Sequence, residues 1–244
     1  MVEILYDAHC HLHEYSDREI EDLLRENDII ITAVSDDLES SIRTLKIWEK
    51  FSDRITPCIG IHPWNSERYE ERDLERILEV MRRLKIKCIG EVGLDLVFTP
   101  HSFNKQLQLF TQILESIRGS DVTLNIHSPG AWGRVLNLLQ RYDVKKALFH
   151  WYTGPLDLLK EIRSSGYMIS INPALRIQEK HMEVAKRVDL EGFLVESDGP
   201  YNYKGMQLSP RMILSTVKLL AEIRGLDYED ITRILETNYR RLFS

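Results

Sequence analysis

The first apolar run of the chain carries two histidines, His9 and His11, separated by a single residue. Successive side chains of a β-strand point to opposite faces, so both imidazoles are expected on the same face. Imidazole is a common protein ligand for zinc and related metals, and two on one strand supply half of a tetrahedral site. The pair alone is equally compatible with polar residues on the solvent face of an edge strand.

Seven further apolar runs follow, separated by segments with helical periodicity. All eight runs are rich in Ile, Val, Leu and Phe without strict alternation, as expected for parallel strands that are covered on both faces. The predicted strands are residues 4–12, 28–35, 55–63, 86–94, 122–128, 145–151, 167–173 and 193–200. The predicted helices are residues 38–51, 73–84, 103–117, 131–142, 156–164 and 178–188, then one from Ser209 to Gly225 and one beginning at Asp227.

This alternation predicts a single (β/α)8 TIM-like barrel domain over residues 1–244. An open, doubly wound sheet is the second candidate. It would need a glycine-rich turn after the first strand, and the residues from His9 to His13 contain no glycine.

In a (β/α)8 barrel, the active site lies at the carboxyl ends of the strands. Five of the eight predicted strands end in a histidine or a carboxylate suited to metal ligation. Each of these residues alone could be a hydrogen-bonded structural residue or a turn former, but their coincidence at equivalent positions predicts a metal centre. The predicted ligands are His9, His11, Glu91, His127, His150 and Asp198.

Six ligands exceed what one tetrahedral ion needs and suit two divalent ions about 3.5–4 Å apart. We expect Glu91 to bridge the ions through its two oxygens, because it lies on the fourth strand, between the other ligands. Mixed imidazole and carboxylate ligation suits zinc, manganese or a similar metal better than magnesium, which prefers oxygen ligands.

The formal net charge of −6 and the pI near 5.8 give no overall field that would attract nucleic acid. The three cysteines, Cys10, Cys58 and Cys88, show no metal-type spacing and no pairing pattern, which predicts reduced thiols in a cytosolic protein. No apolar stretch reaches transmembrane length, so we expect a cytoplasmic protein without a membrane partner.

Six ordered motifs resemble the TatD-type metal-dependent hydrolases of the amidohydrolase superfamily. They are Asp7-Ala8-His9-Cys10-His11-Leu12, Gly60-Ile61-His62-Pro63-Trp64, Ile89-Gly90-Glu91-Val92-Gly93-Leu94-Asp95, Asn125-Ile126-His127-Ser128, Phe149-His150-Trp151-Tyr152-Thr153-Gly154 and Glu196-Ser197-Asp198-Gly199-Pro200-Tyr201. The resemblance implies a TIM-like barrel, the same six metal ligands and hydrolysis of phosphodiesters, with single-stranded DNA or a small phosphoester as substrate. It further implies that Asp198 accepts a proton from the attacking water, that Glu91 is catalytic and that His62 contacts the substrate.

The chain departs from the family pattern where substrate would bind. Ser128-Pro129-Gly130 stands where the family usually has an arginine, and the loop at 201–210 offers one cation, Lys204. Lys204 and His62 are therefore the predicted phosphate contacts. The reduced positive charge keeps open a hydrolase of an amide, lactone or aminoacyl ester on the same centre, and a binding protein with an inactive site is a third interpretation.

Several other residues have more modest predicted roles. Three acids share strand faces with predicted ligands and could hold their imidazoles in place: Asp7, Asp95 and Glu196. Three tryptophans could line the mouth of the site or simply pack: Trp64, Trp132 and Trp151. His13 and Glu14 are expected on the rim rather than among the ligands, and His101 and His181 are expected at the surface.

Overall fold

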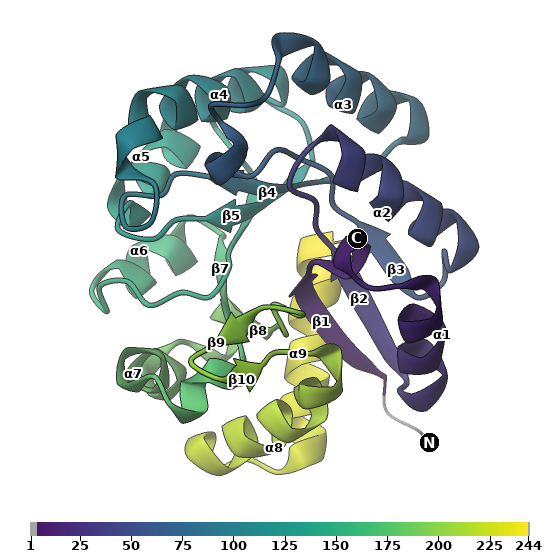
Figure 1. Cartoon of the computed structure of the whole chain (residues 1–244). Coiled ribbons are helices and arrows are strands. Elements are labelled where there is room, and N and C mark those ends of the chain that lie inside the picture. Colours follow the sequence, from purple (N-terminus) through teal and green to yellow (C-terminus); the bar gives the residue numbers. More distant parts are fainter. Residues whose placement is uncertain (1–3, 244) are drawn as a thin grey trace.

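The computed structural model describes residues 4–243. Eight parallel strands alternate with helices along the chain and lie inside a ring of them (Figure 1). The strands are β1 (Leu5–Cys10), β2 (Ile29–Ala33), β3 (Ile55–Pro57), β4 (Cys88–Gly93), β5 (Thr123–His127), β6 (Lys146–Phe149), β7 (Met168–Ile171) and β8 (Phe193–Val195). The helices are α1 (Asp17–Glu26), α2 (Leu38–Lys50), α3 (Glu71–Leu84), α4 (Phe103–Ser116), α5 (Trp132–Arg141), α6 (Leu158–Ser164), α7 (Glu179–Arg187), α8 (Ile213–Arg224) and α9 (Tyr228–Phe243).

The strands form two hydrogen-bonded ladders, β1-β2-β3 and β4-β5-β6-β7-β8. At one seam, the amide of Gly90 donates to the carbonyl of Ile59 over 3.2 Å, which links the end of β3 to β4. At the other seam, the amide of Asp198 donates to the carbonyl of His9 over 3.0 Å, which links the end of β8 to β1. The predicted (β/α)8 barrel is confirmed, with the first and eighth strands as neighbours.

The core has two layers. The larger one lies between the strands and the surrounding helices and contains, for example, Ile31, Leu124 and Val135. A smaller cluster brings residues of β1, β6, β7 and β8 together with Tyr239 and Leu242 of α9. The hydroxyl of Tyr239 is within 2.8 Å of Thr32 Oγ1, so α9 is anchored to the strands. Apolar side chains therefore fill the part of the barrel next to α9, and the carboxyl ends of the strands are left for polar groups.

An irregularity in β1 decides where its histidines point. The pairing of β1 with β2 shifts register between Asp7 and Cys10. Tyr6 and Ala8 pack in the cluster with α9, whereas Cys10 packs in the outer layer. Strict alternation would place His9 on the face opposite Ala8, but the bulge turns His9 to the inside as well.

The predicted helices are present, with ends within two residues of the expected positions except at the start of α8. There a 3₁₀ turn, Pro210–Met212, follows Ser209 and α8 begins at Ile213. Gly225 ends α8 in the left-handed conformation with φ 62°. Sequence reasoning missed α1, although Ser16 and Glu19 form a capping box at its start. It also missed the small hairpin of β9 (Asn202–Tyr203) and β10 (Met206–Gln207) after β8.

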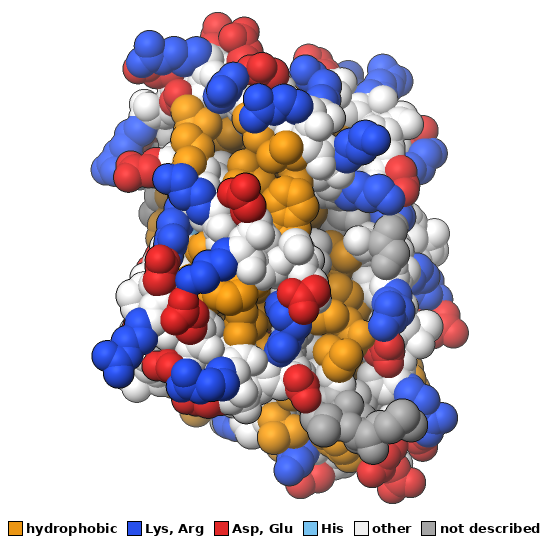
Figure 2. Space-filling view, turned by 90° about the vertical axis from the view of Figure 1, so that its right-hand side faces the viewer, with side chains coloured by type: hydrophobic (Ala, Val, Ile, Leu, Met, Phe, Trp, Pro, Cys, Tyr) orange, Lys and Arg blue, Asp and Glu red, His pale blue; other side chains and the backbone are white. Residues whose placement is uncertain are grey.

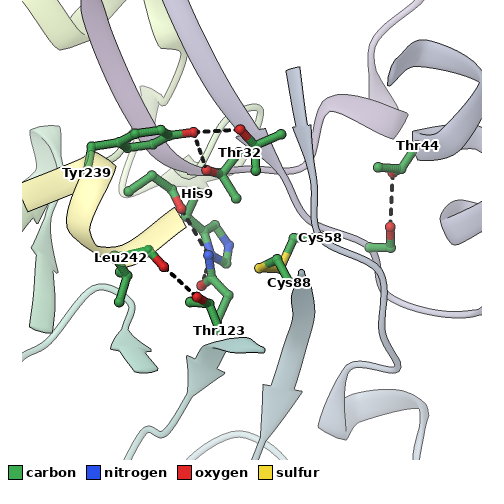
Figure 3. Close-up of a disulfide and its surroundings, with 12 residues drawn as sticks. His9, Thr32, Thr44, Cys58, Cys88, Thr123, Tyr239 and Leu242 are labelled. Carbon is green, nitrogen blue, oxygen red and sulfur yellow. Dashed lines mark hydrogen bonds between the residues drawn. A yellow bond between two sulfur atoms is a disulfide. The ribbon is translucent and has the colours of Figure 1, made fainter. Parts of the chain in front are cut away.

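The prediction that all three cysteines are reduced is wrong. Cys58 and Cys88 form a disulfide with their Cα atoms 4.5 Å apart, and only Cys10 is a free thiol among the described residues (Figure 3). Their separation of 30 residues gives no local pairing pattern. The barrel places the end of β3 beside the start of β4, so the bond crosses the seam between the two ladders.

Charged side chains of both signs are interspersed over the side that carries α1 and α2, with apolar side chains between them (Figure 2). Within residues 4–243, no helix has the length and apolar character needed to cross a lipid bilayer.

Candidate metal centre

The six predicted ligands converge at the carboxyl ends of the strands. His9, Glu91, His127, His150 and Asp198 are buried, and the His11 side chain is 14% exposed. All of them except His9 line a cavity of about 600 Å³. They form two groups that share Glu91.

The first group joins the two histidines of β1 with Asp198. The Nε2 atoms of His9 and His11 lie 3.3 Å apart. Both face Glu91 Oε2, at 3.3 and 3.2 Å, and Asp198 Oδ1, at 3.4 and 3.5 Å. His9 and His11 therefore share a face, as predicted, and meet the residue that follows β8.

The second group joins the histidines that end β5 and follow β6. His127 Nδ1 lies 2.6 Å and His150 Nε2 lies 2.9 Å from the other oxygen of Glu91, Oε1. The two ring nitrogens are 3.3 Å apart. Glu91 thus presents one oxygen to each group, as expected of a bridging carboxylate.

In His9 and His127, the ring nitrogen that faces away from Glu91, here called the outer nitrogen, takes part in a hydrogen bond. These hydrogen bonds identify which nitrogen of each ring has a free lone pair. The amide nitrogen of Asn125 donates to the carbonyl of Ala8 over 2.9 Å, so its Oδ1 must accept from His9 Nδ1 over 2.8 Å. Asp95 Oδ2 accepts from His127 Nε2 over 2.9 Å. A neutral imidazole that donates from one nitrogen has a lone pair on the other. The inner nitrogens of both rings therefore direct lone pairs at carboxylate oxygens.

With neutral rings, these lone pairs and the carboxylates that they face repel unless a cation lies between them. Glu91 Oε2 is buried and has no hydrogen-bond partner, although two imidazole nitrogens lie close to it. Two cations, one in each group, would satisfy this set of donors. The residues present therefore fit a two-ion centre.

The remaining two imidazoles also have acidic neighbours on their outer side. Glu196 Oε1 lies 3.5 Å from His150 Nδ1, and Asp36 Oδ1 lies 3.2 Å from His11 Nδ1. Neither contact is a hydrogen bond, so these two acids favour the ring orientation through charge rather than through a hydrogen bond. Asp95 and Glu196 lie where we predicted. Asp7 instead accepts from the backbone amides of Ser197 and His9, at 2.8 and 3.2 Å, and does not touch an imidazole.

The electrostatics of the site favour ionised carboxylates. Burial alone would raise the pKa of Glu91, but the imidazoles around it, His150 and His62 foremost, hold its pKa well below the usual range. Burial also opposes ionisation of Asp198, and the nearby imidazoles of His11 and His9 outweigh it, so the pKa of Asp198 is lowered. Both groups are thus available as anions to balance bound cations.

His62 lies in the cavity but does not present a free lone pair to it. Its Nδ1 accepts from the amide of Trp64 over 3.1 Å, so Nε2 carries the proton and points at Glu91 Oε1, 3.2 Å away. His62 is therefore placed as a donor beside the centre rather than as a ligand. Lys204 occupies the turn between β9 and β10, with Nζ 5.3 Å from the ring centre of Tyr203, and does not line the cavity.

The mouth of the cavity is aromatic. Trp64 and Phe98 are 44% and 60% exposed and meet edge to face, with ring centres 5.8 Å apart. On the other side Trp151 packs against Tyr201 and Tyr203, with ring centres 5.9 and 5.1 Å apart. Trp64, Trp132 and Trp151 all line the cavity, as one of the two interpretations expected. The lining residues include no lysine or arginine.

Two histidines outside the centre differ in their exposure to solvent. His101 is 68% exposed, in agreement with the prediction. The prediction for His181 is wrong, because this side chain is fully buried. Its Nδ1 donates to the carbonyl of Tyr152 and its Nε2 accepts from the amide of Asn172, both over 3.0 Å. The helical periodicity of α7 could not reveal these two backbone partners.

Comparison with known proteins gives one consistent result. The family described as TatD related DNase matches residues 6–244. The chain is 26% identical over 260 residues to the human deoxyribonuclease TATDN3, covering 98% of this chain and 94% of that protein. It is 24% identical over 245 residues to an uncharacterized metal-dependent hydrolase of Methanocaldococcus jannaschii, covering 97% and 96%. The solved structure of YJJV, a TatD homologue from Escherichia coli, superposes with a TM-score of 0.90 at 24% identity, covering 100% of this chain and 99% of that one.

Proposed function

This chain belongs to the TatD-related DNase family, and from that premise we propose that it is a metal-dependent hydrolase of phosphodiester bonds. The observation that carries the proposal is the convergence of four imidazoles and two carboxylates into two groups that share Glu91. We propose two divalent ions of the zinc or manganese type, with His9, His11 and Asp198 around one, His127 and His150 around the other, and Glu91 between them.

Divalent ions held by these residues would polarise a phosphoryl oxygen and lower the pKa of water to near neutrality. The protein supplies the remaining functions. Asp198 is the proposed proton acceptor for the attacking water, because its carboxylate is ionised and reaches the cavity. Glu91 holds the two groups together. His62 donates from Nε2, which suits contact with an anionic substrate oxygen.

The aromatic mouth supports single-stranded DNA or a small phosphoester as substrate. Bases of a single strand stack on exposed aromatic side chains, each with about 1–3 kcal/mol by alanine substitution, whereas paired bases present no free face. Trp64, Phe98 and Trp151 surround the entrance to the centre. The lining contains no lysine or arginine, so we propose that Lys204 in the β9–β10 turn contacts the phosphate backbone. We also propose that the salt dependence of binding is shallow.

A second candidate is a hydrolase of an amide, lactone or aminoacyl ester on the same centre. The cavity lining favours it, because an apolar, aromatic space without lysine or arginine also fits a neutral substrate. The same six residues and Asp198 would serve this reaction.

A cytoplasmic location is also part of the proposal. The Cys58–Cys88 disulfide counts against it, because structural disulfides are rare in reducing compartments outside hyperthermophiles.

The deciding experiment uses full-length protein freed of metal with a chelator and reloaded with Zn²⁺ or Mn²⁺. We expect turnover of a single-stranded oligonucleotide and of a nitrophenyl phosphodiester, with activity that falls only slightly as salt rises. Steady turnover of a simple lactone with neither phosphoester cleaved would replace the main proposal with the second candidate. No turnover of any of these substrates by protein shown to contain metal would refute both.

A further inference from the structure

A second cluster of metal-binding side chains lies on the rim of the cavity. This rim cluster comprises His13, Glu14 and Asp36. Together with His11 they offer ligand atoms that all lie within 4.8 Å of one another. His13 and Glu14 belong to the short 3₁₀ helix η1 (Leu12–Glu14) directly after β1, and Asp36 follows β2. Glu14 and Asp36 line the cavity, so an ion bound here would face the space that receives substrate.

The orientation of His13 is fixed by the backbone. Its Nδ1 lies 3.1 Å from the carbonyl oxygen of Val34, which can only accept, so Nδ1 carries the hydrogen. In the neutral, metal-binding form of the ring, Nε2 is then the nitrogen with the lone pair, and it lies 3.2 Å from Asp36 Oδ2. A lone pair directed at a carboxylate oxygen is favourable only with a positive charge between them.

Asp36 is held rigidly but its carboxylate is not satisfied. Its backbone carbonyl accepts from the amide of His62 over 2.8 Å and from Asn65 Nδ2 over 2.9 Å. Its Oδ1 is buried and makes no hydrogen bond, although His11 Nδ1 is 3.2 Å away. The backbone thus fixes a carboxylate between two imidazoles without completing its hydrogen bonds.

We propose that His13 Nε2 and the carboxylates of Glu14 and Asp36 bind a third divalent cation, separate from the two held through Glu91. One imidazole with two carboxylates suits Mn²⁺, Zn²⁺ or Co²⁺. Three protein ligands leave coordination positions open toward the cavity. Because the lining contains no lysine or arginine, this ion supplies the positive charge at the rim that an anionic substrate needs. The proposal goes beyond the two-ion hydrolase and does not depend on which bond is cleaved.

The test counts bound metal. Metal-free, full-length protein is equilibrated with rising free Mn²⁺, and bound Mn²⁺ per chain is measured by elemental analysis and by calorimetric titration. Wild type is compared with His13→Ala and with Glu14→Ala, which truncates an exposed side chain. His101→Ala is the matched control, since His101 is exposed and does not line the cavity. Circular dichroism confirms that each variant is folded.

We expect three Mn²⁺ per chain in wild type and in His101→Ala. In His13→Ala and Glu14→Ala the last equivalent should bind at least about tenfold more weakly or be lost, while two ions remain. Saturation of wild type at two ions, or unchanged binding of the third ion in both variants, would overturn the rim site and leave the two-ion proposal standing. Saturation of wild type below two ions would instead refute the two-ion centre.

Discussion

Asp95→Asn tests whether the outer hydrogen bonds of the centre control metal binding. The Asp95 carboxylate accepts four hydrogen bonds. Oδ2 accepts from Trp64 Nε1 over 2.6 Å and from His127 Nε2 over 2.9 Å. Oδ1 accepts from the amides of Val97 and Phe98, over 2.8 and 2.7 Å. An asparagine amide accepts at only one of its two ends, so one of these pairs must lose its acceptor.

The expected loss of stability in Asp95→Asn follows from the number of donors that are left without an acceptor. Each donor left without an acceptor costs about 1–3 kcal/mol, and the partial exposure of Trp64 and Phe98 reduces the total, so the free energy of unfolding should fall by about 2–4 kcal/mol. If the amide group turns its NH₂ to His127, Nε2 of that ring must become the acceptor. The hydrogen then moves to Nδ1, the nitrogen that faces Glu91. Metal affinity should therefore fall by about 10- to 100-fold.

Two measurements on the same variant separate these effects. Urea unfolding of the metal-free protein gives the change in stability, and competition with a chelator gives the metal affinity. Trp64→Phe is the matched control, because it removes one donor to Asp95 and leaves the bond to His127 in place. We expect it to retain metal affinity within a few-fold. If Asp95→Asn lowers stability but binds both ions as tightly as wild type, then Asp95 only fixes the loop at 95–98, and our account of His127 is refuted.

Three further predictions concern other parts of the molecule. Asp198→Asn should keep its fold and lose about 10²- to 10⁴-fold in turnover, and full activity would show that Asp198 is not the proton acceptor. Gly93→Ala should lower the free energy of unfolding by about 3 kcal/mol or more in urea titration, because a Cβ at Gly93 (φ 145°) would overlap the carbonyl oxygen of His127. Burial lowers the pKa of His181 to about 4, below its unfolded value near 6.5, so protonation favours unfolding and stability should fall by roughly 3 kcal/mol as the pH drops from 6.5 to 4. His181→Gln should flatten that pH dependence, and an unchanged slope would contradict the assignment.

The strands and the six converging residues could be predicted because they depend on local patterns. Apolar runs mark buried parallel strands, and the barrel brings strand ends together whatever their distance along the chain. The shared face of His9 and His11 follows from their spacing alone. Which face that is could not be predicted, because strict alternation from Tyr6 points His9 outward and the bulge in β1 reverses it.

Partners that depend on tertiary contacts left no pattern in the sequence. Asn125 holds His9 across a separation of 116 residues, and nothing in its own neighbourhood distinguishes it from any other buried strand residue. Asp36 lies after β2 among other polar residues, and only the fold places it between His11 and His13. His181 has an ordinary helical neighbourhood, and its two backbone partners become visible only when β7 and the segment after β6 pack beside it.

The disulfide determines what proteolytic cleavage between Cys58 and Cys88 does to the molecule. Cys58 and Cys88 close residues 58–88, including α3, into a covalent ring that spans the seam between the two ladders (Figure 3). A protease that cuts the backbone once inside this ring leaves an amino-terminal piece with His9 and His11 still tied to a carboxy-terminal piece with Glu91. On a gel without reductant the nicked protein should migrate as one chain, and with reductant as two. The halves of the proposed metal centre therefore remain one molecule after the chain between them has been broken.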